Sequence, residues 1–374
     1  MKFTCTRENF RQALETVSPL AGKHAHLPIL ANILIQASEA KVEIISTNLE
    51  VAIKTLVRAK VEKTGSFTVP AKMLTDFVHL LEQETVDLEV EGIELIITSG
   101  STHTKIKGML ADEFPVLPEV EEKYGYVVDV GFFKDGLQKT VISVAKNEIR
   151  PELSGVFFRF STERYNGLLL AATDSYRLSE THVPLLQNGE KEISCIVPAR
   201  VVYETIRLLG ITVESGEKQV RLFVGDNQIA LRYGMFEMSA RLIQGRYPDY
   251  AQIIPTNFKT TAQFPVDHLI NKIKAASLFT VSGINAVSFD LNASENTIGV
   301  SSASTQAGEH SSELEAEIVG EENSILLNHR YVLDGLQHIG SGKSEFCVNS
   351  GDAPCLFRPT GNENFLYIVM PIRQ

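Results

Sequence analysis

Hydrophobic residues recur at helical spacing in six segments of the chain, and these segments come in three pairs. The second segment of each pair reads VPAKMLTDFVHLL, VPARVVYETIRLL or LNHRYVLDGLQHI, beginning at Val69, Val197 and Leu327. The three starts lie 128 and 130 residues apart. Proline or a polar residue near the start, followed by a regular apolar stripe, predicts a helix that packs one face on a core.

The first segment of each pair repeats with the same period. These segments begin at Phe10, Phe133 and Val266, and they follow alternating, strand-like runs at 2–6, 126–130 and 260–264. Each third of the chain then closes on a short run with proline, at Pro115, Pro248 and Pro371. A period of about 125–130 residues is the size of a small domain and far too long for a solenoid unit.

Between the predicted helices lie short runs rich in Val, Ile and Thr, bounded by polar turns. Glu91-Gly92, Asp226-Asn227 and the segment 292–296 supply turn chemistry typical of hairpins. We therefore predict an α+β fold of three tandem domains, each with two helices and about eight short strands in antiparallel sheets. The predicted boundaries are 1–124, 125–254 and 255–374, with linkers at 118–125 and 252–259.

Composition places the chain among soluble globular proteins, with 44% hydrophobic and 22% charged residues. No apolar run approaches the roughly 18 residues that indicate a membrane span, and the first residues lack the apolar core of a signal peptide. Four scattered cysteines without a C-x-x-C pair are expected to be small core residues in a reducing cytoplasm. We expect a cytoplasmic protein without a membrane partner.

The net charge of −11 argues by itself against binding to nucleic acid. The charge is unevenly distributed, however, because Lys and Arg outnumber Asp and Glu by 13 to 9 in the six helical segments. The remaining residues are correspondingly acidic. If the helices share one face, that face could hold a polyanion. The alternative is that these cations simply solvate helix surfaces.

The sequence carries no convincing catalytic or metal-binding motif. The segment 338–344 ends in G-K-S like a phosphate-binding loop, but Gln337 stands where that motif needs glycine, and a predicted strand follows it, so a turn is expected. His24 and His26 have a chelating spacing without a nearby third ligand. Asp174-Ser175 lacks the turn motif of a nucleophilic serine. We expect no catalytic residue, no metal and no cofactor.

The three-fold repeat and its motifs resemble the bacterial DNA sliding clamp family, the beta subunit of DNA polymerase III. The resemblance covers the whole chain. The motifs that carry it are Met1-Lys2-Phe3, Leu27-Pro28-Ile29-Leu30 with Asn32, the two VPA helices, the segment 172–178 (ATDSYRL), the segment 245–250 (GRYPDY), the segment 331–334 (YVLD) and the ending 367–373 (YIVMPIR).

The resemblance implies a non-enzymatic processivity factor for DNA replication. Two copies would join head to tail into a homodimeric ring of six domains, with helices lining the hole and sheets outside. The ring would encircle duplex DNA without sequence specificity. It would tether the replicative DNA polymerase catalytic subunit, and it would also bind the clamp loader and other polymerases and repair proteins that carry clamp-binding peptides.

In this family partner peptides dock in an apolar pocket between the second and third domains. The matching residues here are Leu153, Thr173, Ser175, Tyr176, Arg177, Leu178, Pro248, Ile253, Asn328, Tyr331, Val369, Met370, Pro371 and Ile372. The alternative for a residue such as Leu178 or Met370 is a plain core position. Ser175-Tyr176 stands where many members have Gly-His, and Gln252 stands where a basic residue is frequent.

The resemblance also implies surfaces for DNA and for ring closure. The expected DNA-binding residues are Lys23, His24, Lys134, Lys139, Lys146, Arg150, Arg200, Arg207, Lys272 and Lys274. The expected dimer interface includes Thr104 and Ile106 on one side and Ser277 and Leu278 on the other. Two other classes of function stay open at this stage: a repeated-domain hydrolytic enzyme, and a protein-interaction scaffold that does not encircle DNA.

Overall fold

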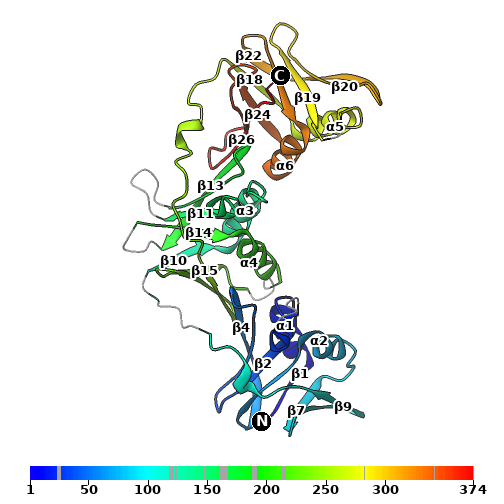
Figure 1. The fold of residues 1–374 in the computed structure, drawn as a ribbon, viewed down its shortest axis with the longest axis vertical. Coiled ribbons are helices and arrows are strands. Elements are labelled where there is room, and N and C mark those ends of the chain that lie inside the picture. The colour runs from blue at the N-terminus through cyan, green and yellow to red at the C-terminus, as the bar shows by residue number, and fades with distance from the viewer. Residues whose placement is uncertain are drawn as a thin grey trace. The chain divides into compact units, whose positions relative to one another are not determined.

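The computed structural model describes residues 1–22, 27–117, 122, 124–146, 149–160, 167–187, 192–211, 216–281, 283–340 and 342–373 (Figure 1). These residues form two compact units. The first contains Met1–Val130 and Arg207–Leu242, and the second contains Gly131–Ile206 and Ile243–Gln374. The division passes through the middle third of the chain, so each unit holds parts of two sequence repeats.

The described residues contain the three predicted helix pairs. The helices are α1 (Arg7–Val17), α2 (Ala71–His79), α3 (Val130–Val141), α4 (Ala199–Ile211), α5 (Val266–Ser277) and α6 (His329–Ile339). The helix α1 begins three residues before the predicted start. Thr6 caps it there, because its side-chain oxygen accepts a hydrogen bond from the Asn9 amide at 3.3 Å.

The first unit contains two antiparallel sheets. One has the order β5 (Ala59–Lys63), β1 (Lys2–Thr6), β7 (Thr85–Glu91), β8 (Glu94–Ser99) and β9 (Thr102–Lys107). The other runs through β6 (Gly65–Pro70), β2 (Asn32–Ala37), β3 (Val42–Thr47), β4 (Val51–Val57), β17 (Phe236–Arg241), β16 (Gln228–Tyr233), β15 (Gln219–Val224) and β10 (Gly125–Asp129).

The second unit repeats this arrangement. One sheet runs through β14 (Ile193–Pro198), β11 (Gly155–Phe160), β12 (Gly167–Thr173), β13 (Arg177–Gln187), β26 (Phe365–Val369), β25 (Cys355–Pro359), β24 (Lys343–Val348), β18 (Thr260–Pro265) and β22 (Glu317–Gly320). The other has the order β21 (Gly308–Glu315), β20 (Thr297–Ser304), β19 (Ala286–Asn292) and β23 (Asn323–Asn328).

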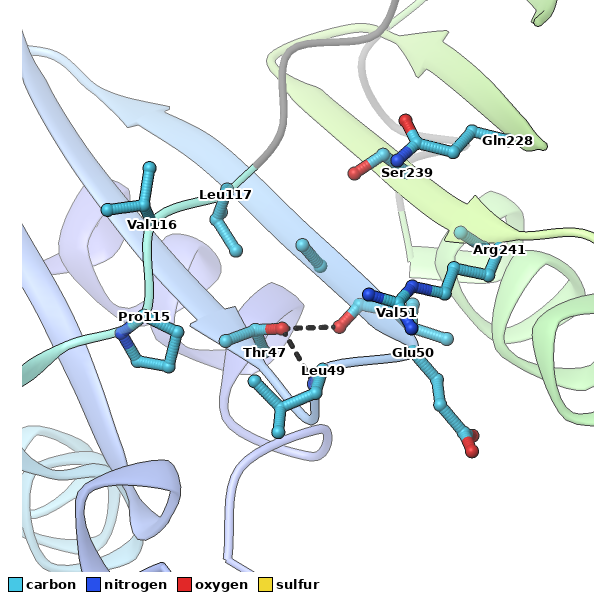
Figure 2. A pocket seen from close by; sticks show the side chains of 12 residues that line it. Thr47, Leu49, Glu50, Val51, Pro115, Val116, Leu117, Gln228, Ser239 and Arg241 are labelled. Atoms are coloured by element: carbon cyan, nitrogen blue, oxygen red, sulfur yellow. Dashed lines mark hydrogen bonds between the residues drawn. The ribbon is translucent and has the colours of Figure 1, made fainter. Parts of the chain in front are cut away.

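Two strand pairs join successive repeats edge to edge. We call β4 with β17 the first junction and β13 with β26 the second junction. A cavity of about 240 Å³ lies beside the first junction, within the first unit (Figure 2). The strands β9 and β21 each end their own sheet. Along one edge of each of these strands, the backbone N–H and C=O groups therefore have no neighbouring strand among the described residues.

The hairpin predictions at Glu91-Gly92, Asp226-Asn227 and 292–296 are confirmed by β7–β8, β15–β16 and β19–β20. The turn after α6 is also confirmed, because strand β24 begins at Lys343 and no helix follows the glycines. All four cysteines are free and buried, as expected. Most of the predicted linker 118–125, and His24 and His26, lie outside the described residues.

Candidate functional site

The turn between β12 and β13 forms the centre of the second junction. The Thr173 hydroxyl donates to the Arg177 carbonyl at 2.7 Å and accepts from the Ser175 amide at 3.1 Å. Asp174 Oδ1 accepts from the amides of Tyr176 and Arg177, each at 3.0 Å. These bonds hold Ser175 at a φ of 76°, in the left-handed region. The local polar residues therefore fix a turn that presents residues 175 and 176 to solvent.

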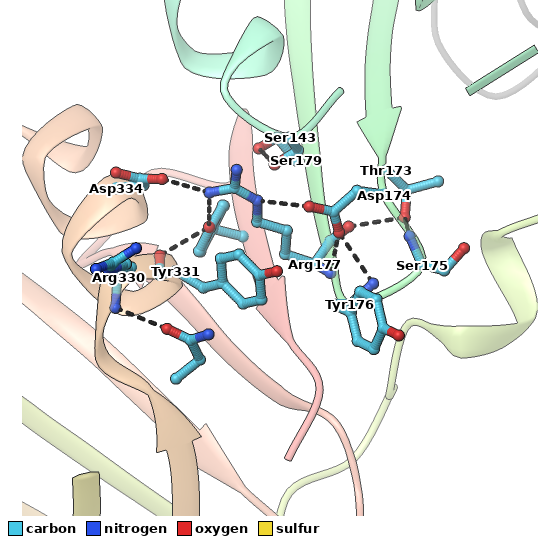
Figure 3. Close-up of polar contacts among 12 residues, drawn as sticks. Ser143, Thr173, Asp174, Ser175, Tyr176, Arg177, Ser179, Arg330, Tyr331 and Asp334 are labelled. Carbon is cyan, nitrogen blue, oxygen red and sulfur yellow. Dashed lines mark hydrogen bonds and ion pairs between the residues drawn. The ribbon is translucent and has the colours of Figure 1, made fainter. Parts of the chain in front are cut away.

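Arg177 connects this turn to the last repeat (Figure 3). Its guanidinium donates to Asp174 Oδ2 at 3.0 Å and to Asp334 Oδ2 at 2.6 Å, and it lies 4.6 Å from the centre of the Tyr331 ring. Burial disfavours its charge, but Tyr367 and the two carboxylates outweigh burial, so the pKa of Arg177 is raised. Arg177 is thus a permanently charged structural link.

The C-terminal strand places the last residues beside the turn. Arg177 lies opposite Val369 and Leu178 opposite Ile368 in the β13–β26 ladder. The Met370 amide donates to the Tyr176 carbonyl at 2.8 Å, which extends the pairing one residue beyond the strand. Two segments almost 200 residues apart in the sequence thereby form one continuous surface.

Two apolar clusters contain buried residues of the second junction or of segments packed beside it. One consists of Leu178, Cys347, Leu356 and Ile368, with Tyr250, Ile254, Phe258 and Leu366 packed against it. The other consists of Leu153, Ile196 and Tyr247, and the Tyr247 hydroxyl accepts a hydrogen bond from the Thr173 amide at 3.0 Å. Burial raises the pKa of Tyr247, so this hydroxyl stays protonated at neutral pH.

The predicted peptide-binding residues divide by exposure. Tyr176 and Ile253 are exposed, at 63% and 40%, and Ser175 is also exposed. Half-buried residues lie between the surface and the clusters: Pro248, Asn328, Tyr331, Met370, Pro371 and Ile372. Leu153, Thr173, Arg177, Leu178 and Val369 are buried. The exposed and half-buried side chains are therefore the ones that a partner can reach in this structure.

The network around Arg177 includes side chains that sequence reasoning did not assign to the site. Asp334 and Tyr367 bind Arg177, and the Tyr367 hydroxyl donates to the Tyr331 carbonyl at 2.8 Å. Tyr331 and Tyr176 stack with ring centres 6.5 Å apart. No local pattern in the sequence marks Asp334 or Tyr367 as partners of Arg177, because the strand β13 is itself rich in polar residues.

The predicted DNA-facing cations are not all available to a ligand. Lys146, Arg150, Arg200 and Lys274 are exposed, and Lys134 and Lys272 are half-buried. Arg207 instead donates to the carbonyls of Glu15 and Thr16 at 3.1 and 2.7 Å, at the end of α1. Lys139 pairs with Asp135 at 2.6 Å and lies 5.6 Å from the centre of the Phe365 ring.

Lys23 and His24 lie outside the described residues. Among the residues that are described, no group of three or more His, Cys, Asp or Glu side chains could hold a metal ion. No helix in this part of the chain is long and apolar enough to cross a membrane.

The predicted dimer residues lie on or beside the two open edges. Thr104 and Ile106 are on β9, and Ser277 and Leu278 end α5 next to β20 and β21. Leu278 is 74% exposed, but Ile106 is only 3% exposed. Ile106 packs in its own repeat, so a charged residue there would disturb the core as well as any interface, whereas Leu278 is open to a partner. The dimer interface stays a prediction.

The repeated helix-and-sheet domains, joined through edge strands, define the DNA-clamp class of α+β proteins. Family models for the N-terminal, central and C-terminal domains of the DNA polymerase III beta subunit match residues 1–118, 128–249 and 251–373. The chain belongs to the DNA polymerase III beta subunit family. This confirms three tandem clamp domains, whereas the predicted boundaries at 124 and 254 stay a prediction.

Similar proteins span the full length of the chain. The beta sliding clamp of Synechocystis sp. is 28% identical over 393 residues, covering 100% of this chain and 99% of the relative. A crystal structure of the DNA polymerase III beta subunit from Thermotoga maritima superposes with a TM-score of 0.91 at 29% identity. The Bacillus subtilis sliding clamp structure gives 0.93 at 26% identity, and each comparison covers 100% of this chain and 99% of the other.

Proposed function

We propose that this protein is the sliding clamp of a bacterial replicative DNA polymerase. It closes as a homodimeric ring around duplex DNA without sequence specificity, and it tethers the polymerase and other partners through short peptides. The observation that carries this proposal is the match of three clamp domains over almost the whole chain, together with two strands, β9 and β21, that end their sheets.

The internal junctions supply the geometry for ring closure. In β3 and β20 the same contact recurs, because Ser46 Oγ donates to the Val17 carbonyl and Ser302 Oγ donates to the Ala276 carbonyl near the ends of α1 and α5. Ser46 lies opposite Ile53 of β4, and Ser302 lies opposite His310 of β21. The strand β21 therefore corresponds to β4, the strand that binds β17.

The strand β9 corresponds in turn to β17, since each follows a two-residue turn at the end of its meander. In the first junction Met238 lies opposite Ile53 and Ser239 opposite Ala52. Applied between two copies, this register places Thr104 opposite His310 and Lys105 opposite Glu309. Opposite charges across a strand pair stabilise it modestly, which supports this register. Leu278 lies on the helix that contacts β21 and would be covered.

The proposed DNA-facing surface consists of exposed cations on α4 and α5 and in the segment that follows α3. Lys146, Arg150, Arg200 and Lys274 are exposed and can contact phosphate, although Arg150 also pairs with Glu152, and Lys134 and Lys272 can contribute with their half-buried side chains. Arg207 donates to two backbone carbonyls of α1, and Lys139 is half-buried beside Asp135 and Phe365, so we assign these two to structure rather than to DNA contact. Contacts with phosphate carry no sequence information, as a protein that slides on DNA requires.

The second junction is the proposed docking surface for partner peptides. The exposed and half-buried side chains around Tyr176, Met370 and Ile253 receive the peptide, and the network of Arg177 holds the turn in place. The partners are the catalytic subunit of the replicative polymerase, the clamp loader, and other polymerases or repair proteins with such peptides. Adaptable Met and aromatic side chains suit several related sequences.

Tyr176→Ala combined with Met370→Ala tests this docking surface. Each partner side chain buried there contributes roughly 1.5–3 kcal/mol, so losing both contacts should weaken a polymerase-tail peptide by about tenfold or more. Fluorescence polarisation of the labelled peptide measures the affinity. Leu186→Ala, which truncates an exposed leucine elsewhere on β13, is the matched control and should leave affinity unchanged. Equal binding by all three proteins would refute the assignment.

A further inference from the structure

The cavity at the first junction is formed by three segments of the first unit. These are the turn 47–52, the segment Pro115–Leu117, and the strands β16 and β17. Figure 2 shows Pro115, Val116 and Leu117 on one side of the turn and Arg241 of β17 on the other. The guanidinium of Arg241 extends over the turn, whereas the carboxylate of Glu50 points away from it.

The turn of this cavity repeats the turn of the second junction atom by atom. The Thr47 hydroxyl donates to the Val51 carbonyl at 2.9 Å and accepts from the Leu49 amide at 3.0 Å. Asn48 Oδ1 accepts from the amides of Glu50 and Val51 at 3.0 and 2.8 Å. Leu49 has a φ of 74°, against 76° for Ser175.

The neighbouring strand repeats as well. The Arg241 amide donates to the Glu50 carbonyl at 3.0 Å, as the Met370 amide donates to that of Tyr176 at 2.8 Å. The short runs Phe114-Pro115 and Tyr247-Pro248 close the two repeats in the same way. The cavity therefore occupies, at the first junction, the place that the proposed peptide-docking surface has at the second.

The side chains around the two turns differ in chemistry. Ala52 replaces Leu178, which leaves open space where the second junction is filled. Leu49 replaces Ser175, and Arg241 replaces Met370. Leu49 is 47% exposed and Val116 is 94% exposed. An exposed leucine held in the left-handed region is costly for the fold alone, because Gly or Asn would adopt that conformation more readily.

We propose that the first junction is a second peptide-docking site, which takes one apolar side chain followed by a carboxylate. The apolar side chain lies against Leu49, Val116 and Leu117, and the carboxylate pairs with Arg241. A volume of about 240 Å³ is below the roughly 300–1,000 Å³ of sites for whole small molecules, so a single side chain of an extended peptide is the fitting occupant. The inference rests on the proposed peptide-binding role of the second junction.

Calorimetric titration of the full chain with the synthetic peptide Ser-Leu-Phe-Asp-Leu tests the proposal. The unchanged protein should bind two equivalents per chain. The variant with Leu49→Asn and Arg241→Gln should bind one equivalent of peptide. Asparagine is chosen at position 49 because it tolerates the left-handed conformation of the turn and so leaves the fold intact. Tyr176→Ala with Met370→Ala should retain the other equivalent. Replacing Asp by Asn in the peptide should weaken the first-junction site about two- to fivefold, because its ion pair is exposed.

Lys60→Gln removes an exposed cation of the same unit away from the cavity, and it should leave both equivalents in place. If the unchanged protein bound one equivalent, lost only in the Tyr176 and Met370 variant, the first-junction site would be refuted and the second-junction proposal would stand. If only the Leu49 and Arg241 variant lost binding, the first-junction site would stand alone. Absence of any binding would refute both sites.

Discussion

Arg177 shows at the residue scale how one buried side chain can join two repeats of the chain. Its partners Asp174 and Asp334 come from two repeats, the second of them 157 residues away in the sequence. A buried charge without such partners would cost several kcal/mol, so the pair fixes the position of β13 against α6. If the proposed docking role is right, the turn is already ordered before a peptide binds, which reduces the entropy lost on binding.

The sequence identified Arg177 through the family motif, but it did not identify Asp334 or Tyr367 as its partners. No local pattern connects residues so far apart, and only the β13–β26 pairing brings them together. Leu178 is a residue that the sequence did assign to the site but whose burial it did not predict. It was predicted as a pocket wall, and it is fully buried in an apolar cluster.

The buried cysteines make stability sensitive to alkaline pH. Burial raises the pKa of Cys5 and Cys195 to about 12 and that of Cys347 to about 11, from an ordinary value of 9.0. Because the folded pKa is the higher one, the thiols stabilise the fold fully below pH 9, and this contribution is lost as pH rises toward 11–12. By pH 10 each of these thiols should cost about 1.4 kcal/mol.

Urea denaturation at pH 8 and pH 10 measures this effect. Cys195→Ala with Cys347→Ala should show a smaller fall in the midpoint than the unchanged protein, because two of the titrating groups are absent. A fall of the same size in both proteins would show that other groups cause the alkaline loss.

At the scale of elements, the hydrophobic pattern predicts the helices well and the strand edges poorly. The six predicted helices are all found among the described residues where the periodicity places them, because each buries one stripe against a sheet. The pattern could not show which strands end a sheet, since pairing between distant strands leaves no local signal. Nor could it show that Ile106 points into its own core, although it sits on the edge strand β9.

The exposed cations on α4, on α5 and in the segment after α3 carry a prediction for DNA binding. Changing Lys146, Arg200 and Lys274 to Glu should weaken retention on DNA and reduce its dependence on salt, because fewer phosphate contacts release fewer counterions. Retention of the protein on nicked circular DNA at several salt concentrations provides the measurement.

A triple variant of Lys60, Lys63 and Lys218 to Glu is the matched control for this change in charge. These lysines are exposed on strands and a loop of the first unit, outside the helices. The control should retain the salt dependence of the unchanged protein. Equal losses in both triple variants would mean that net charge, rather than the positions of Lys146, Arg200 and Lys274, governs binding.

At the scale of the whole molecule, three repeats of one domain explain both the internal junctions and the open edges. The repeat was visible in the sequence because each domain has two helices with an apolar face and a proline-containing run near its end. The sequence alone could not supply the register between copies. That register follows from the observed pairing of β4 with β17, transferred to β21 and β9.

Topological linkage to DNA tests the central claim most directly, and a covalently closed ring makes it measurable. In the β4–β17 ladder the backbone hydrogen bonds Arg241–Glu50 and Leu56–Met235 lie at the two ends. Because hydrogen-bonded and non-hydrogen-bonded pairs alternate along an antiparallel ladder, Met238 and Ile53 form a non-hydrogen-bonded pair, whose side chains lie close together. In the proposed interface Thr104 and His310 occupy the positions of Met238 and Ile53. Changing both to Cys should therefore join two copies by a disulfide at each of the two interfaces.

The variant, with Cys5, Cys195, Cys347 and Cys355 replaced by Ala if they interfere, is oxidised in the presence of nicked circular DNA. The sample is then passed through a sizing column in high salt, before and after one cut linearises the DNA. A sliding clamp predicts that the disulfide-closed dimer stays with circular DNA and leaves linear DNA. The claim that the ring encircles DNA would be contradicted if the closed dimer stayed equally on circular and linear DNA. It would also be contradicted if a verified closed dimer were lost equally from both.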